Sequence, residues 1–167
     1  AGVPELLEEI VTKLPAPSGD ENAPTRALLV DSWYDSYLGV VILVRVVDGT
    51  LSRGQKIKFM ATGAEYVVDK IGYFTPKMVN VDKLHTGEIG FIITGMKTIH
   101  DCKVGDTIID ARAENANALP GFKPSVPVVF SSFFPVEADD YPTFRESAEK
   151  LALNDASFMF TDRKSVV

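Results

Sequence analysis

The chain has 167 residues, of which 46% are hydrophobic and 24% are charged, and its formal net charge at pH 7 is -6. This composition is that of an ordinary folded domain and excludes disordered and collagen-like chains. The acidic balance argues against a general nucleic-acid coat. The charge is uneven, however, with -4 on residues 1–25, +1 on residues 26–113 and -3 on residues 114–167. A local basic surface is therefore still expected on the middle segment.

The first 25 residues predict a short helix and a linker. The helix is expected over Pro4 to Leu14, because apolar residues recur there at helical spacing and proline suits its first turn. The segment from Pro15 to Pro24 is rich in proline and glycine and predicts a linker. An isolated amphipathic helix followed by such a linker suggests the end of a preceding domain, so we expect the chain to be a fragment of a longer protein.

The run from Gly39 to Gly54 is the strongest strand signal. Val40 to Val47 is rich in β-branched residues, which favour a strand, and Asp48-Gly49 predicts a tight hairpin turn. Both faces of this strand are apolar except at Arg45. One row of side chains is therefore expected to fill a core, and the other to be covered, for example by a neighbouring domain.

Short strands separated by turn residues continue over residues 26–113 and predict an all-β barrel or sandwich. These strands are expected at Arg26–Asp31, Val40–Val47, Gln55–Met60, Glu65–Gly72, Glu88–Thr94 and Thr107–Ile109. A second linker is expected over Ala111 to Gly121.

The last segment, residues 114–167, predicts a strand, a helix and a strand after this linker. The strands are expected over Ser125 to Phe134 and Ala156 to Thr161, and the helix begins near Asp139-Asp140, which can cap it. Two strands and one helix are too little for a core of their own. We therefore expect an α+β domain that is truncated here and continues beyond Val167.

The residues from Gly49 to Lys56 nearly match the sequence pattern of a phosphate-binding loop. The two glycines have the right spacing, but Gln55 stands where the lysine of such a loop is required. Strands are expected on both sides, whereas a phosphate loop leads into a helix. A turn between strands is the better interpretation.

Metal-binding and catalytic patterns are weak throughout. His85, His100 and Cys102 match no structural zinc spacing, and adjacent Asp139 and Asp140 suit a helix cap better than catalysis. The sequence therefore predicts no catalytic, cofactor or metal residues in this chain.

Basic residues offer the better candidates. Lys56 and Lys58 alternate with apolar residues along one strand, so both should point away from the core. Together with neighbouring cations they could contact RNA phosphates, although an ordinary solvated face explains them as well. The candidate RNA contacts are Arg53, Lys56, Lys58, Lys70 and Lys77, and Arg45 is a separate candidate for a domain interface. Phe74 is either an exposed loop aromatic or a satellite core residue, and the second interpretation is favoured.

Several runs of residues resemble known translation factors. R-V-V-D-G-T-L-S-R-G-Q-K-I (Arg45 to Ile57), G-E-I-G-F and V-G-D-T-I resemble the second domain of translational GTPases, an elongation factor Tu-like β-barrel. A finer resemblance is to the elongation factor 4 (LepA) family. It is carried by D-S-W-Y-D-S-Y-L-G-V-V, G-Y-F-T-P-K, A-L-P-G-F-K, F-P-V-E-A-D-D-Y and K-L-A-L-N-D-A-S, and it covers essentially the whole chain.

The resemblance implies a mainly β chain with a defined domain order. Residues 1–25 would be the last helix of a GTP-binding domain and its linker, residues 26–113 the β-barrel domain II, and residues 114–167 a linker and the truncated first half of a ferredoxin-like domain III. The parent would be a ribosome-dependent GTPase that acts on tRNA-bearing ribosomes, in translation fidelity or back-translocation. Its GTP and Mg would bind in the missing domain, because the P-loop, switch and guanine motifs are absent here.

For this fragment, the resemblance implies contact with small-subunit ribosomal RNA and coupling of the GTPase domain to the distal domains. The parent is expected to be cytoplasmic, with peripheral association at the cytoplasmic face of the bacterial inner membrane. The alternatives are another translational GTPase, such as elongation factor G, and a stand-alone RNA-binding or adaptor barrel without enzymatic activity.

Overall fold

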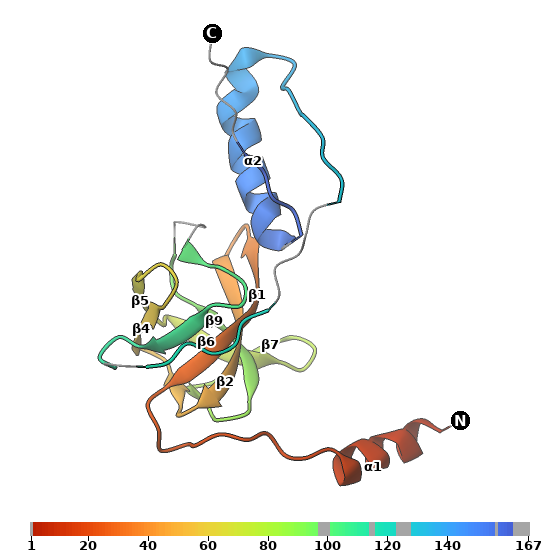
Figure 1. Cartoon of the computed structure of the whole chain (residues 1–167), viewed down its shortest axis with the longest axis vertical. Helices are drawn as coiled ribbons and strands as arrows, with labels where there is room; N and C mark the ends of the chain where they lie inside the picture. Colours follow the sequence, from red (N-terminus) through yellow and green to blue (C-terminus); the bar gives the residue numbers. More distant parts are fainter. Residues whose placement is uncertain (1, 97–100, 114–115, 123–127, 156, 162–167) are drawn as a thin grey trace.

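The computed structural model describes residues 2–96, 101–113, 116–122, 128–155 and 157–161. Within these residues a β-barrel stands between two helices (Figure 1). The helical elements are α1 (Val3–Lys13), a short 3-10 turn η2 (Ala138–Asp140) and α2 (Tyr141–Asn154). The strands are β1 (Arg26–Asp35), β2 (Gly39–Asp48), β3 (Leu51–Ser52), β4 (Lys56–Phe59), β5 (Glu65–Val67), β6 (Lys70–Phe74), β7 (Met78–Asn80), β8 (Lys83–Leu84), β9 (Ile89–Ile93) and β10 (Thr107–Asp110).

Antiparallel pairing joins these strands in two sheets. The larger has the order β5-β4-β10-β1-β2-β9-β6-β7, and the smaller pairs β3 with β8. Gly54 N–H donates to the Val68 carbonyl at 2.8 Å and Val68 N–H donates to the Gln55 carbonyl at 3.0 Å, which extends the pairing of β4 with β5. The chain then passes from β5, at one edge of the sheet, directly into β6, next to the other edge, so the two ends of the curled sheet come together. The mainly β barrel expected from the sequence is therefore confirmed.

The core of the barrel is lined by one face of β2 and its neighbours. Val40, Ile42, Val44 and Val46 are buried in the main apolar cluster, so the prediction that one row of this strand fills the core is confirmed. The other row is covered only in part. Val41 is buried against Phe91 and Ile93, while Arg45 is exposed further along the strand. Trp33 and Leu38 also pack against this small cluster, so the barrel itself covers part of the row.

Three local predictions about the strands are corrected. Asp48-Gly49 is not a hairpin turn, because β2 pairs with β1 and β9 while β3 pairs with β8. The single strand expected over Glu65–Gly72 is two strands, because the chain leaves β4 at Val68 and Asp69 N–H donates to the Ile93 carbonyl on β9 at 2.8 Å. The third correction is β7, which lies between the strands expected at Glu65–Gly72 and Glu88–Thr94, where no strand was predicted.

The expected linkers lie against the barrel. Gly19 is so close to β2 that an added Cβ would lie 2.0 Å from the Val47 carbonyl oxygen. Asp20 accepts a hydrogen bond from Gly49 N–H at 2.8 Å. After the barrel, Leu119 N–H donates to Thr107 Oγ1 at 2.8 Å. Both segments are therefore held by specific contacts, whereas α1 has no buried residue and stands apart (Figure 1).

The C-terminal segment differs from the predicted β-α-β unit. The helix is present as α2, but the described residues 128–134 and 157–161 form no strand, and the rest of each expected strand lies outside the described residues. A strand needs a neighbour to pair its backbone, and the described chain offers none to these segments. Asp139 and Asp140 lie in η2, and Asp140 is the N-cap residue of α2, as expected, but its side chain makes no capping hydrogen bond.

Candidate nucleic-acid interface

The two lysines of β4 point away from the core, as predicted. Ile57 and Phe59 are fully buried, whereas Lys56 is exposed and Lys58 half-buried. The alternation follows from the two-residue period of a strand. β4 pairs with β5 in a register that places Lys58 opposite Glu65.

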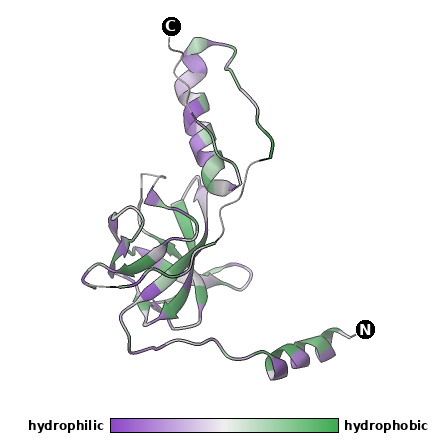
Figure 2. Cartoon of the chain, in the orientation of Figure 1, coloured by the Kyte–Doolittle hydropathy of each residue, from purple (hydrophilic) through white to green (hydrophobic). Residues whose placement is uncertain are grey.

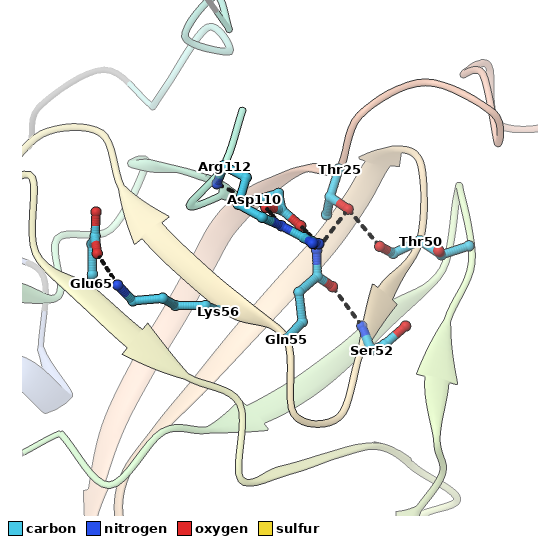
Figure 3. A network of polar contacts seen from close by, with 8 residues as sticks. All are labelled: Thr25, Thr50, Ser52, Gln55, Lys56, Glu65, Asp110 and Arg112. Atoms are coloured by element: carbon cyan, nitrogen blue, oxygen red, sulfur yellow. Dashed lines mark hydrogen bonds and ion pairs between the residues drawn. The ribbon is translucent and has the colours of Figure 1, made fainter. Parts of the chain in front are cut away.

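Glu65 supplies an acidic partner to these lysines. The Lys56 ammonium lies 2.5 Å from Glu65 Oε2 (Figure 3). This hydrogen bond and the Lys56 charge lower the pKa of Glu65, with a further contribution from the charge of Lys58. Because the carboxylate offsets positive charge on this strand, the β4 lysines attract an external phosphate less strongly than an unpaired pair would.

Arg53 and Lys70 form a different arrangement. Both line a shallow hollow of about 220 Å³ together with Ile71, Asn80, Val81 and Asp82. Arg53 is anchored there, since its Nε donates to the Asp69 carbonyl at 3.1 Å. Within the described part of the chain neither cation has a carboxylate partner. The remaining polar residues of the lining are Asn80, which is neutral, and Asp82, which is acidic but forms no ion pair with either cation.

The remaining candidates lie apart from these two pairs. Lys77 is exposed in the turn between β6 and β7, where its carbonyl accepts a hydrogen bond from Thr75 N–H at 2.9 Å. Arg45 is exposed on β2, opposite Leu28 and Ile89 of the neighbouring strands. The five candidate RNA contacts are therefore found in three places, at the hollow, on β4 and in the turn between β6 and β7, and Arg45 is on β2.

Phe74 is packed, as the favoured interpretation predicted. Its ring centroid lies 6.0 Å from that of Trp33 and 5.2 Å from that of Phe91, both in tilted geometry. The side chain remains 41% exposed. It therefore extends the small apolar cluster around Val41 on the outside of the barrel.

A polar network centred on Gln55 was missed by sequence reasoning. Gln55 Oε1 accepts from Ser52 N–H at 2.9 Å, and Nε2 donates to Thr25 Oγ1 at 3.1 Å and to Asp110 Oδ2 at 2.9 Å (Figure 3). The only sequence signal was a polar residue inside a turn between strands, at the position where a phosphate loop would need lysine. The predicted turn between strands is confirmed, since β3 precedes Gln55 and β4 follows it.

Other chemistry has little support among the residues described. They contain no group of three His, Cys, Asp or Glu side chains placed to hold a metal ion. Burial raises the pKa of the Cys102 thiol to about 11, which disfavours a reactive thiolate. His100 lies outside the described residues, and His85 pairs with Glu21 at 2.7 Å. No helix in the described part of the chain is long and apolar enough to cross a membrane.

The barrel can now be compared with known families. Residues 39–109 match the family model of elongation factor Tu domain 2. The match runs from the first residue of β2 into β10, and it therefore includes Arg53, Lys56, Lys58, Lys70 and Lys77. An elongation factor Tu domain 2 indicates a protein of the translational GTPase type. It also agrees with interaction with the ribosome in general terms.

Proposed function

We propose that this chain is part of an elongation factor 4 (LepA)-type translational GTPase, in which the barrel contacts small-subunit ribosomal RNA and couples the segments on its two sides. The observation that carries the proposal is the elongation factor Tu domain 2 match over the barrel. The finer assignment rests on the sequence resemblance of the Trp33, Phe74–Lys77 and Leu119–Lys123 segments.

In this proposal GTP and Mg bind to a domain outside these residues, and the parent acts on ribosomes that carry tRNAs. A role in fidelity or back-translocation, a cytoplasmic location and peripheral association with the inner membrane belong to the same proposal. The flanking reading frame tests it most directly. A G-x-x-x-x-G-K-[ST] motif upstream supports a GTPase parent, and its absence rejects one. A downstream sequence typical of elongation factor G would reject the elongation factor 4 assignment.

Arg53 and Lys70 are the leading candidates for phosphate contacts. They share one hollow and form no ion pair among the described residues, although Asp82 also lines that hollow, whereas Lys56 is paired with Glu65. Each phosphate contact releases about one counterion. The double variant Arg53→Gln with Lys70→Gln should therefore reduce the salt slope of binding to small ribosomal subunits by about 1 to 2. The slope is measured from dissociation constants over a series of salt concentrations.

Two further variants make this test comparative. Lys56→Gln with Lys58→Gln should reduce the slope less, because Glu65 already offsets charge on β4. Lys13→Gln changes a distant lysine that pairs with Glu9 on α1 and should leave the slope unchanged. Equal slopes for all the variants, or no measurable binding of the unmodified chain, would reject the proposed RNA contact.

A further inference from the structure

Gln55 joins parts of the chain that are far apart in sequence. Its side chain bonds Thr25, which lies 30 residues before it, and Asp110, which lies 55 residues after it. Thr25 ends the segment that leads into the barrel, and Asp110 ends the last strand of the barrel. A single carboxamide therefore bonds both the segment that precedes the barrel and the segment that follows it.

The incoming segment, defined here as residues 17–25, is fixed to the barrel along its length. Asp20 N–H donates to Asp48 Oδ1 at 3.1 Å, and Gly49 N–H donates back to the Asp20 carbonyl at 2.8 Å. At its end, Thr25 Oγ1 donates to the Thr50 carbonyl at 2.6 Å (Figure 3). Because Thr25 Oγ1 also accepts from Gln55, its hydroxyl is used in both directions.

The outgoing segment, defined here as residues 110–113 and 116–122, is fixed in the same way. Ala111 N–H donates to the Lys56 carbonyl at 2.9 Å, next to Gln55 in the chain. Asp110 also accepts from Arg112, whose Nε and Nη2 lie 3.2 Å from its carboxylate oxygens (Figure 3). Further along, an added Cβ on Gly121 would lie 2.8 Å from the Gly105 carbonyl oxygen, so the segment runs tightly against the barrel.

The two segments face each other across an open hollow of about 490 Å³. Its walls are formed by residues 21–25 and Thr50 on one side and by Asp110, Arg112 and Ala113 on the other. The Gln55 side chain bridges the two sides, because it bonds both Thr25 and Asp110. Arg26 of β1 bonds Asp48 of β2 at 2.5 and 2.8 Å and the Asn117 carbonyl at 3.3 Å, and none of these three residues lines the hollow.

We infer that Gln55 is a coupling residue, through which a displacement of the incoming segment is transmitted to the outgoing segment and the reverse. The Gln55 amide nitrogen has two N–H groups, and it donates to both Thr25 Oγ1 and Asp110 Oδ2. Because both donors belong to one rigid carboxamide, loss of one bond lets the group move and changes the geometry of the other. The inference rests on the coupling part of the proposed function. It does not depend on ribosome binding, so the salt-slope test and the test below can fail separately.

Hydrogen exchange at two backbone amides tests this coupling. Gly49 N–H reports on the incoming segment through its bond to Asp20, and Ala111 N–H reports on the outgoing segment through its bond to Lys56. Thr25→Val should raise the exchange rate of Ala111 at least about threefold, and Asp110→Ala should raise that of Gly49 similarly. In a Gln55→Leu background both cross-effects should disappear, because the connecting carboxamide is gone.

Two controls complete the design. Asn22→Ala lies on the incoming segment beside the same hollow but removes no side-chain hydrogen bond seen in the described chain, so it should leave Ala111 unchanged. Gln55→Glu replaces the donor to Asp110 by a second carboxylate, so it should raise the exchange rates of both Gly49 and Ala111. This variant keeps the inference testable if the Gln55→Leu protein fails to fold. Cross-effects that persist without Gln55, or that are absent in the unmodified background, would overturn the inference.

Discussion

Two aspartates at the ends of β10 show how residue environment decides charge. Hydrogen bonds from the Arg112 guanidinium, and then from its backbone N–H and from Gln55, lower the pKa of Asp110 to about 2. Burial instead raises the pKa of Asp106, although N–H groups of Thr107 and Ala61 bond its carboxylate. The pKa values of two aspartates four positions apart are thus shifted in opposite directions. Asp110 gains a charged hydrogen-bond donor, which favours the carboxylate, while Asp106 loses contact with water, which disfavours it.

This difference predicts a pH dependence with a definite sign. The pKa of an aspartate in an unfolded chain is about 3.9. Asp110 should therefore contribute stability above that pH and lose its contribution as pH falls toward about 2. Asp106 should contribute in the opposite sense, most at low pH and less as pH rises through its folded value. NMR titration of the side-chain carboxyl carbons should show Asp110 titrating at lower pH than Asp106, and the reverse order would contradict both assignments.

At the scale of elements, α2 is attached to the barrel by few side chains. Leu153 is 6% exposed and belongs to the main apolar cluster, next to the half-buried Tyr34 of β1. The Lys150 ammonium lies 4.7 Å from the centroid of the Tyr34 ring. Tyr141 and Phe144, near the start of the same helix, are less buried, and each is 39% exposed. The helix was therefore predicted correctly, while its main contact with the barrel was not.

Leu153→Ala should loosen α2 selectively. Removing a buried leucine side chain costs about 2 to 5 kcal/mol in well-packed sites. We expect faster hydrogen exchange throughout α2 and a lower midpoint in urea, with the barrel strands retained. Leu151→Ala is the matched control, because that side chain is 50% exposed in the same helix and should have a much smaller effect. Equal effects of the two substitutions would show that Leu153 does not anchor the helix.

The whole molecule combines a packed barrel with exposed apolar segments on both sides. Figure 2 shows apolar residues along the barrel strands and also along α1, which has no buried residue. Between the barrel and α2, Phe130 is 84% exposed and Phe134 is 85% exposed. Such exposure marks surfaces where another protein segment can pack.

Limited proteolysis should reveal this division. Chymotrypsin should cut first within residues 128–136, at the exposed phenylalanines, because this described segment has no strand or helix to protect its backbone. The first stable product should contain the barrel together with the incoming and outgoing segments, because the contacts of these segments hold them to the barrel. Mass spectrometry identifies the cut sites. A first cut beside Tyr73 or Phe74, in β6, would show that the barrel is the less stable part.

The sequence by itself determined the features that depend on neighbouring residues. The β-branched run predicted β2 and its core-facing row, alternation placed Ile57 and Phe59 inside and the β4 lysines outside, and turn residues separated most of the strands. Helical spacing located α1 and α2. These predictions succeed because side-chain direction follows the local period of a strand or helix.

Only the tertiary structure decided which segments became partners. It paired β3 with β8 across the barrel, placed Glu65 against Lys56, and brought Arg53 and Lys70 to one hollow. It also placed Gln55 between Thr25 and Asp110. Local periodicity says which way each of these side chains points, but not what lies there, because the partner is set by the register and closure of a barrel whose strands come from distant parts of the chain.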